Sequence, residues 1–208
     1  MRPDNLDPGR YEVYSRSLHA VCFAIKGLRL ALDCGEPGRV AEGLAAVGGA
    51  LALTGNATGK QLFAEAEALA DSLTTARARG VVAFWRGFLA YGEGRWAPAR
   101  ASWESAATLL GETPGLIIDI LRAQAYLLLA EMHLGNYAEL ALHTAAAMAV
   151  ARETGNLYTE VTALMYSALP RLAAGDLRGA LGRIRESEAR TPRDSWNSFS
   201  RMKLHVQC

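Results

Sequence analysis

Apolar residues recur along this chain at intervals of three and four positions, which places their side chains on one face of an α-helix. One such run is Trp96, Ala99, Trp103, Ala106 and Leu110, and a second is Leu62, Ala66, Leu69 and Leu73. Alanine and leucine are abundant, and both favour helices by intrinsic propensity. The pattern predicts helices over 11–34, 38–53, 58–77, 79–93, 96–110, 115–134, 137–154, 157–174 and 177–190, and another from 195 onward.

Short turns that begin with glycine recur between these helices. Gly55, Gly94, Gly135 and Gly175 are 39, 41 and 40 residues apart, and glycine readily takes the left-handed conformation that ends a helix. The chain is therefore predicted to repeat a helix–turn–helix unit about every forty residues.

Polar residues in the turns predict where helices begin. Asn136 and Asp176 are candidate N-caps, Thr58 forms a possible capping box with Gln61, and Thr113 precedes Pro114 at a favourable helix start. Within 157–174, Pro170 is predicted to kink the helix, because proline has no N–H group to donate.

One helix pair cannot bury its apolar face alone, whereas stacked pairs share a continuous core. The predicted fold is therefore all-α, a right-handed α-solenoid of antiparallel helix pairs with a period of about forty residues. Residues 11–208 are predicted to form a single domain, after a disordered or extended N-terminal segment over 1–10.

Composition excludes some classes of partner. The 208 residues are 50% hydrophobic and 21% charged, with a formal net charge of +1. This composition is not that of a disordered chain, and its charge gives no general attraction to nucleic acid or to anionic membrane. The most apolar segment, 116–134, contains Asp119, Arg122 and Glu131 and is not predicted to span a membrane.

Cysteine usage predicts a reducing, cytoplasmic setting. The three cysteines, Cys22, Cys34 and Cys208, are odd in number and form no CxxC motif, so they do not indicate a disulfide framework. Cys22 and Cys34 lie in an apolar helical stretch and are predicted to be small core residues. The polar N-terminus has no apolar signal core.

The unit from Gly80 to Thr113 resembles a tetratricopeptide repeat. The resemblance rests on Gly87, Gly94, Trp96, Ala99, Trp103 and Ala106. The units at 121–154 and 161–194 match more loosely, through Ala130, Gly135, Tyr137 and Ala147 and through Ala168, Gly175, Leu177 and Ala180.

The runs GLRLALDCGEPGRVAEGLAAVGGALALTGN, ARGVVAFWRGFLAYGEGRWAPARASWESAATLL and ARETGNLYTEVTALMYSALPRLAAGDLRGALGRI also resemble the helical tail of large bacterial signalling proteins. In those proteins a serine/threonine kinase domain and an NTPase module precede the tail. The resemblance implies that this chain is a fragment of such a protein, with a role in signal transduction. The sequence holds none of the kinase motifs, so kinase activity is not expected of these residues.

Candidate chemistry is sparse, and we expect no catalytic residue, cofactor or metal site. Residues 54–61, TGNATGKQ, resemble a phosphate-binding loop, but Thr54 and Gln61 replace its first glycine and its metal-binding hydroxyl. The favoured interpretation is a turn between helices. Among the histidines, His133 and His143 could approach each other across the Gly135 turn, without an obvious third ligand.

In tetratricopeptide arrays the first helix of each pair lines a concave groove, and the register of the motif predicts which residues would line it here. They are Phe84, Phe88, Tyr91, Arg122, Leu129, Met132, His133 and Met165. Aromatic and methionine side chains suit contact with apolar anchors of a peptide. The alternative, equally favoured, is that these residues are core.

The predicted function is a non-catalytic scaffold that binds a protein or peptide segment, or another domain of its own polypeptide. The alternative is a regulatory sensor that binds a peptide or small molecule in the groove. We expect no nucleic-acid or membrane partner, and the sequence does not predict the oligomeric state.

Overall fold

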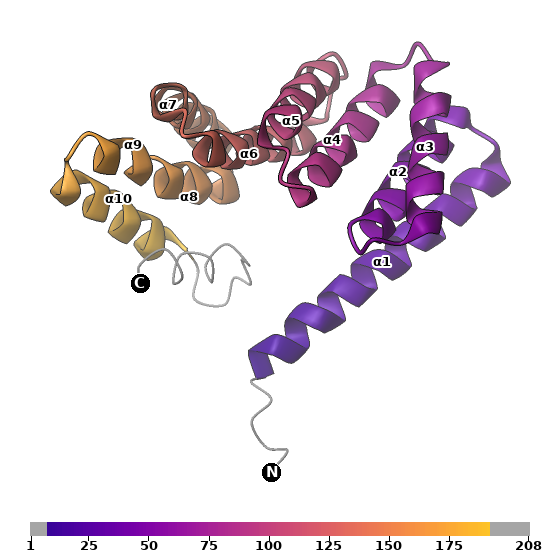
Figure 1. The fold of residues 1–208 in the computed structure, drawn as a ribbon, viewed down its shortest axis with the longest axis horizontal. Helices are drawn as coiled ribbons and strands as arrows, with labels where there is room; N and C mark the ends of the chain where they lie inside the picture. Colours follow the sequence, from indigo (N-terminus) through magenta and orange to yellow (C-terminus); the bar gives the residue numbers. More distant parts are fainter. Residues whose placement is uncertain (1–7, 192–208) are drawn as a thin grey trace.

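In the computed structural model, which describes residues 8–191, every regular element is an α-helix (Figure 1). The helices are α1 (Pro8–Cys34), α2 (Pro37–Ala52), α3 (Ala57–Asp71), α4 (Ala76–Gly92), α5 (Trp96–Gly111), α6 (Ile117–Leu134), α7 (Tyr137–Thr154), α8 (Leu157–Tyr166), α9 (Ala168–Ala173) and α10 (Leu177–Arg190). The all-α class predicted from the periodicity is confirmed. Of the N-terminal segment predicted over 1–10, residues 1–7 lie outside the described residues and residues 8–10 belong to α1. The helix predicted from 195 onward also lies outside the described residues.

Glycines in the left-handed conformation follow most of the helices. They are Gly35, Gly55, Gly94, Gly115, Gly135, Gly155 and Gly175. The last four are 20 residues apart, so one helix and its turn occupy 20 residues and two helices occupy 40. The predicted forty-residue spacing therefore corresponds to a unit of two helices.

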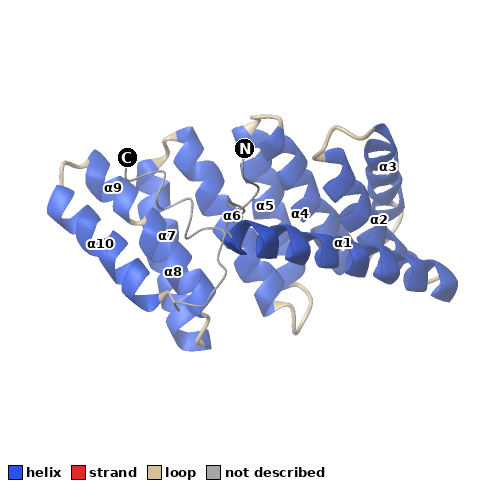
Figure 2. Ribbon diagram, turned by 90° about the horizontal axis from the view of Figure 1, so that it is seen from below, coloured by secondary structure: helices blue, strands red, loops and turns tan. Residues whose placement is uncertain are grey.

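The helices pack in chain order from one end of the molecule to the other (Figures 1 and 2). Packing is most extensive between α2 and α3, α4 and α5, and α5 and α6. Helices two apart in the sequence also pack together, α2 against α4 and α6 against α8. Each helix therefore contacts near neighbours in the sequence, as expected for a helical repeat.

Three core clusters follow one another along this series of helices. The first surrounds Phe63 and joins α2, α3 and α4, the second surrounds Trp103 and joins α4, α5 and α6, and the third surrounds Tyr166 and joins α6, α7 and α8. Trp85 packs against the first and second clusters, and Tyr126 packs against the second and third. These shared side chains make the core continuous.

Several predicted helix boundaries are wrong. α3 ends at Asp71 and α4 begins at Ala76, because the Ser72 hydroxyl donates to the carbonyl of Leu69 and the chain turns over residues 73–75. The start predicted at Thr113 is also wrong, because residues 112–116 form a turn around left-handed Gly115 and α6 begins only at Ile117.

Predicted caps differ in outcome. Asp176 caps α10 by accepting the Gly179 N–H, as predicted. Asn136 is the N-cap residue of α7 but its side chain makes no capping hydrogen bond. The capping box at Thr58 is wrong, because Asn56 is the N-cap of α3 and accepts the Gly59 N–H at 3.0 Å.

The kink predicted at Pro170 is confirmed as a break between α8 and α9. Pro170 has no N–H to donate to the carbonyl of Tyr166, four residues earlier. α8 ends at Tyr166, and α9 begins at Ala168 after one turn residue, Ser167.

The prediction that Cys22 and Cys34 are core residues is wrong, since both are exposed on α1. The apolar pattern of α1 extends over more of its circumference than α2 covers, so apolar character there does not imply burial. None of the helices within residues 8–191 combines the length and apolarity needed to cross a bilayer.

Candidate functional site

The residues predicted to line a groove come from α4, α6 and α8, and the structure divides them by burial. Phe84 and Leu129 are buried in the core, Phe88, Tyr91, Met132 and Met165 are half-buried, and Arg122 and His133 are exposed. The burial of Phe84 and Leu129 agrees with the alternative that these residues are core, whereas the groove stays a prediction for the other six. The six residues that keep some exposure are called the α4/α6/α8 strip below.

An aromatic cluster underlies the strip and fixes its geometry. The ring of Phe88 lies edge-on to Tyr126 at 4.5 Å and to Trp103 at 5.5 Å between centroids. Trp103 is fully buried, and its indole N–H donates to the carbonyl of Phe84 at 3.1 Å. Edge-to-face pairs of this kind are favourable. Phe88 therefore holds α4, α5 and α6 together in addition to reaching the surface.

At one end of the strip, His133 is held between two aromatic side chains. Its imidazole stacks on Trp96, with 4.3 Å between centroids and 13° between planes. Its Nε2 lies 3.0 Å from the Tyr91 hydroxyl. Desolvation lowers the pKa of His133 below its ordinary value and raises the pKa of Tyr91. The neutral imidazole can accept a hydrogen bond from the Tyr91 hydroxyl, so this end offers polar and apolar contacts together.

Arg122 places a positive charge at the edge of the strip. Its guanidinium lies 5.0 Å from the centroid of the Phe84 ring, a cation–π contact. It also lies 3.6 Å from the carboxylate of Asp119 on the same helix. Both partners of this ion pair are well exposed, so Arg122 remains accessible to a carboxylate from a ligand.

Tyrosines form the floor next to the methionines of the strip. Tyr126 and Tyr158 share a hydrogen bond between their side chains, and burial raises the pKa of both. Tyr166 packs with Met132 and Met165, and burial raises its pKa as well. The Tyr166 hydroxyl is buried and has no hydrogen-bond partner in the described part of the chain. A buried hydroxyl without a partner is unfavourable.

A second polar cluster, which the sequence did not predict, ties α5, α6 and α7 together. Glu131 is fully buried, and its Oε1 lies 2.7 Å from Nδ1 of His143 and 3.5 Å from Nε of Arg100. His133 and His143, whose approach across the Gly135 turn was only one possibility, take separate partners, Tyr91 and Glu131. The only sequence signal was Glu131 itself, a carboxylate that directly follows the apolar run 127–130.

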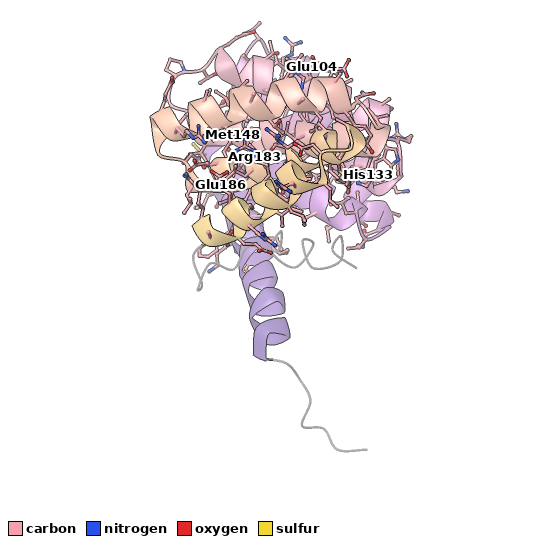
Figure 3. The ribbon with its side chains drawn as sticks, turned by 90° about the vertical axis from the view of Figure 1, so that its left-hand side faces the viewer. Glu104, His133, Met148, Arg183 and Glu186 are labelled. Atoms are coloured by element: carbon pink, nitrogen blue, oxygen red, sulfur yellow. The ribbon has the colours of Figure 1, made fainter. Side chains whose placement is uncertain are left out.

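Beside His143 is a pocket of about 220 Å³ between α5, α6 and α7. Its walls are mainly alanine, leucine and valine, with Glu104, Gln124 and His143 as the larger polar groups. It is separate from the α4/α6/α8 strip, as the positions of Glu104 and His133 show (Figure 3). Glu131 fixes Nδ1 of His143, so Nε2 is the ring nitrogen left for other contacts.

The segment that resembles a phosphate-binding loop does not have the geometry of one. Gly59 and Lys60 lie within α3, and the Gly59 N–H is already bonded to Asn56. A β-carbon at position 59 would fall 2.4 Å from the backbone nitrogen of Ala52, so Gly59 permits close packing of α2 on α3. A pocket of about 340 Å³ next to Lys60 is lined by Glu67 and Glu93, which disfavour a phosphate.

Within residues 21–191, no three His, Cys, Asp or Glu side chains lie together in a way that would hold a metal ion. Neither the protein-family models nor the curated proteins compared with this sequence include a match. The structure shows an all-α fold compatible with a helical repeat. The finer resemblance to tetratricopeptide repeats and to a kinase tail rests on the sequence pattern alone.

Proposed function

We propose that this chain is a non-catalytic helical-repeat scaffold, a right-handed solenoid of antiparallel helix pairs, that binds an amphipathic protein segment along the α4/α6/α8 strip. The observation that carries the proposal is the row of half-buried Phe88, Tyr91, Met132 and Met165 across three helices. These side chains are only partly exposed, and together they offer a partner an apolar surface that spans three helices.

The chemistry of the strip favours a helical or extended peptide with apolar anchors. Met132 and Met165 have flexible, polarisable side chains that adapt to different partners. The aromatic cluster beneath them is rigid, so little order is lost there on binding.

Charge at the edge of the strip suggests how the segment is oriented. Arg122 is exposed at one side, and His133 lies at the far end of α6. We propose that an acidic residue of the bound segment pairs with Arg122, while its apolar residues contact the methionines. Rim charges of this kind set orientation more than affinity.

The biological setting is proposed from the sequence resemblance only. The segment bound would belong to another protein or to another domain of the same polypeptide, in the cytoplasm of a bacterium. A serine/threonine kinase that carries this region as its helical tail would be the parent. Such a parent would supply the kinase activity from other domains.

The test is a selection of peptides of random sequence, displayed on phage, against the protein. Affinities of selected peptides are then measured for Met132→Lys and Met165→Lys, which place a charge on the strip. Ala145→Lys, at an exposed position of α7, is the control. We expect each methionine variant to weaken binding at least about tenfold and the control to have no effect. Failure to select any peptide, or equal binding to all three variants, would refute the proposal.

Phe88→Ala is unsuitable for this test, because Phe88 packs against Trp103 and Tyr126. Its loss would destabilise the helices as well as alter the surface, by about 3 kcal/mol or more. The methionine variants avoid this ambiguity when circular dichroism and thermal unfolding show that they remain folded.

The pocket beside His143 favours a second candidate function, a regulatory sensor of a small molecule. A pocket with apolar walls and a few fixed polar groups is typical of small-ligand sites. A ligand that binds only the folded state raises the unfolding temperature. A thermal-shift screen of small polar metabolites, repeated with Ala146→Trp to fill the pocket, tests this candidate. Any true hit should be lost in that variant.

A further inference from the structure

Helix α1 leaves apolar side chains uncovered on both sides of its contact with α2. Among residues 21–34, Ala31 is buried and Leu28 packs against Gly43 of α2. The exposed large apolar residues are Val21, Phe23, Ile25, Leu30 and Leu32. Figure 1 shows α1 running past α2 and α3 with no other described helix beside this part of it. An apolar surface of this extent indicates an interaction site.

These residues form two separate stripes on the helix. At 100° per residue, Phe23, Gly27, Leu30 and Cys34 share one side of α1. Val21, Ile25 and Leu32 lie on the other side of the α2 contact. The first set is called the Phe23 stripe below. Among the large apolar residues of 21–34, its two members are the most exposed, with Phe23 at 72% and Leu30 at 69%, against 57% for Leu32.

Spacing in the Phe23 stripe is that of a coiled coil. The intervals 23–27, 27–30 and 30–34 are four, three and four residues, which is the alternation of apolar positions in a heptad. A β-carbon built at Gly27 would meet nothing within 4 Å, so the space above it is open. The stripe therefore presents two large residues, Phe23 and Leu30, and two small ones, Gly27 and Cys34, in alternation.

We propose that the Phe23 stripe pairs with the same stripe of a second copy of this chain, with the two α1 helices antiparallel. In that arrangement Leu30 of each copy lies over Gly27 of the other, and Phe23 lies over Cys34. Every layer then joins one large and one small side chain, so the surface is complementary to itself about a twofold axis. A parallel pair would instead oppose Phe23 to Phe23 and Gly27 to Gly27, with crowding in one layer and a void in the next.

Charges beside the stripe favour the same arrangement. Lys26 and Asp33 both border the Phe23 stripe on the side away from α2, seven residues apart. In the antiparallel pair, Lys26 of one copy approaches Asp33 of the other, and the twofold axis makes this contact twice. In a parallel pair Lys26 would not approach Asp33 of the other copy, so this pair of opposite charges would not form.

The size of the surface predicts a modest affinity. Two helices in contact bury less than the roughly 800 Å² per partner that is typical of stable complexes. We therefore expect dissociation constants on the order of micromolar. A dimer should be populated at high protein concentration and should dissociate on dilution.

Sedimentation over a wide range of protein concentration tests the proposal. The unmodified chain should show a monomer–dimer equilibrium. Leu30→Glu buries a charge in the interface and should raise the dissociation constant at least about 100-fold. Leu32→Glu adds the same charge on the other side of α1 and is the matched control. It should change the dissociation constant less than about threefold. A monomer at all concentrations, or equal effects of the two variants, would overturn the proposal.

Two further variants test the orientation. Lys26→Glu and Asp33→Lys should each weaken the dimer, and the two together should restore it, because the exchanged charges again oppose each other.

In a C22S/C208S background, F23C should form an intermolecular disulfide with Cys34 of the second copy under mild oxidation. A cross-link between two Cys34 residues in place of that disulfide would show a parallel pair and refute the antiparallel one.

Discussion

Gly87 of α4 lies against the indole ring of Trp103 of α5. A β-carbon at position 87 would fall 2.4 Å from Nε1 of Trp103, closer than such atoms approach in proteins. The absence of a side chain at Gly87 lets the buried indole reach the carbonyl of Phe84. This contact positions the aromatic cluster beneath the α4/α6/α8 strip.

Gly87→Ala should therefore destabilise the protein by about 2 kcal/mol, because Trp103 cannot move without losing its buried hydrogen bond. Urea unfolding measures the change. Gly182→Ala in α10 is the control, since a β-carbon there would meet nothing within 4 Å. It should stabilise the helix by about 0.5–1 kcal/mol. Equal effects of the two substitutions would show that steric contact at Gly87 is unimportant.

Asn156 and Asn136 provide a comparison of two identical residues at equivalent positions. Both are N-cap residues, but only the Asn156 side chain accepts a hydrogen bond, from the Thr159 N–H at 3.0 Å. Asn156→Ala should cost about 1 kcal/mol of unfolding free energy, and Asn136→Ala only a few tenths. Chemical denaturation of both variants under one set of conditions gives the difference. A larger loss for Asn136→Ala would contradict the assignment of the caps.

The positions of the helices could be predicted because local sequence determines them. Apolar spacing located most of the helices, and glycines marked most of the turns. Where the turn has no glycine, at residues 73–75, the predicted boundaries were wrong by several residues. The turn around Gly115 was also misplaced, because Thr113 and Pro114 give a strong local signal that the left-handed glycine overrides.

Contacts in the candidate site were predictable only where the repeat places residues in register. Tyr91 and His133 are 42 residues apart, close to one repeat, and both were predicted on the same surface, where they meet at 3.0 Å. The contact of Glu131 with His143 depends on the packing of α6 against α7, which periodicity does not specify. The exposure of Cys22 and Cys34 likewise depends on which side of α1 is covered.

Buried Glu131 should contribute far more to stability than an exposed acidic residue does. Glu131→Gln replaces the carboxylate that is hydrogen-bonded to His143 and lies 3.5 Å from Nε of Arg100, and it should cost about 2–3 kcal/mol, since a hydrogen bond to a buried carboxylate is strong. Glu93 forms an ion pair with Arg95, and both side chains are more than half exposed. Glu93→Gln should therefore cost less than about 0.5 kcal/mol of unfolding free energy. Urea denaturation distinguishes the two. Similar losses would mean that the buried contacts of Glu131 with Arg100 and His143 contribute no more than an exposed ion pair does.

The contacts of His133 predict a loss of stability in mild acid. Desolvation lowers the pKa of His133 in the folded protein below the ordinary value of 6.5. Between these two pKa values the unfolded chain binds more protons than the folded one, so acidification favours unfolding. The stability that neutral His133 contributes is fully present above pH 6.5 and is lost as the pH falls through the pKa of His133 in the folded protein. Protonation of Nε2 also removes the lone pair that can accept a hydrogen bond from the Tyr91 hydroxyl.

His133→Gln should therefore lose less stability than the unmodified chain when the pH falls from about 7.5 to about 5. Unfolding free energies of both proteins at each pH give this difference directly, and the other titrating groups cancel in the comparison. Tyr91→Phe is the matched variant, because it keeps the ring beside His133 and removes only the hydroxyl. It should retain the pH dependence that desolvation causes. An unchanged pH dependence in His133→Gln would show that His133 titrates alike in the folded and unfolded chains.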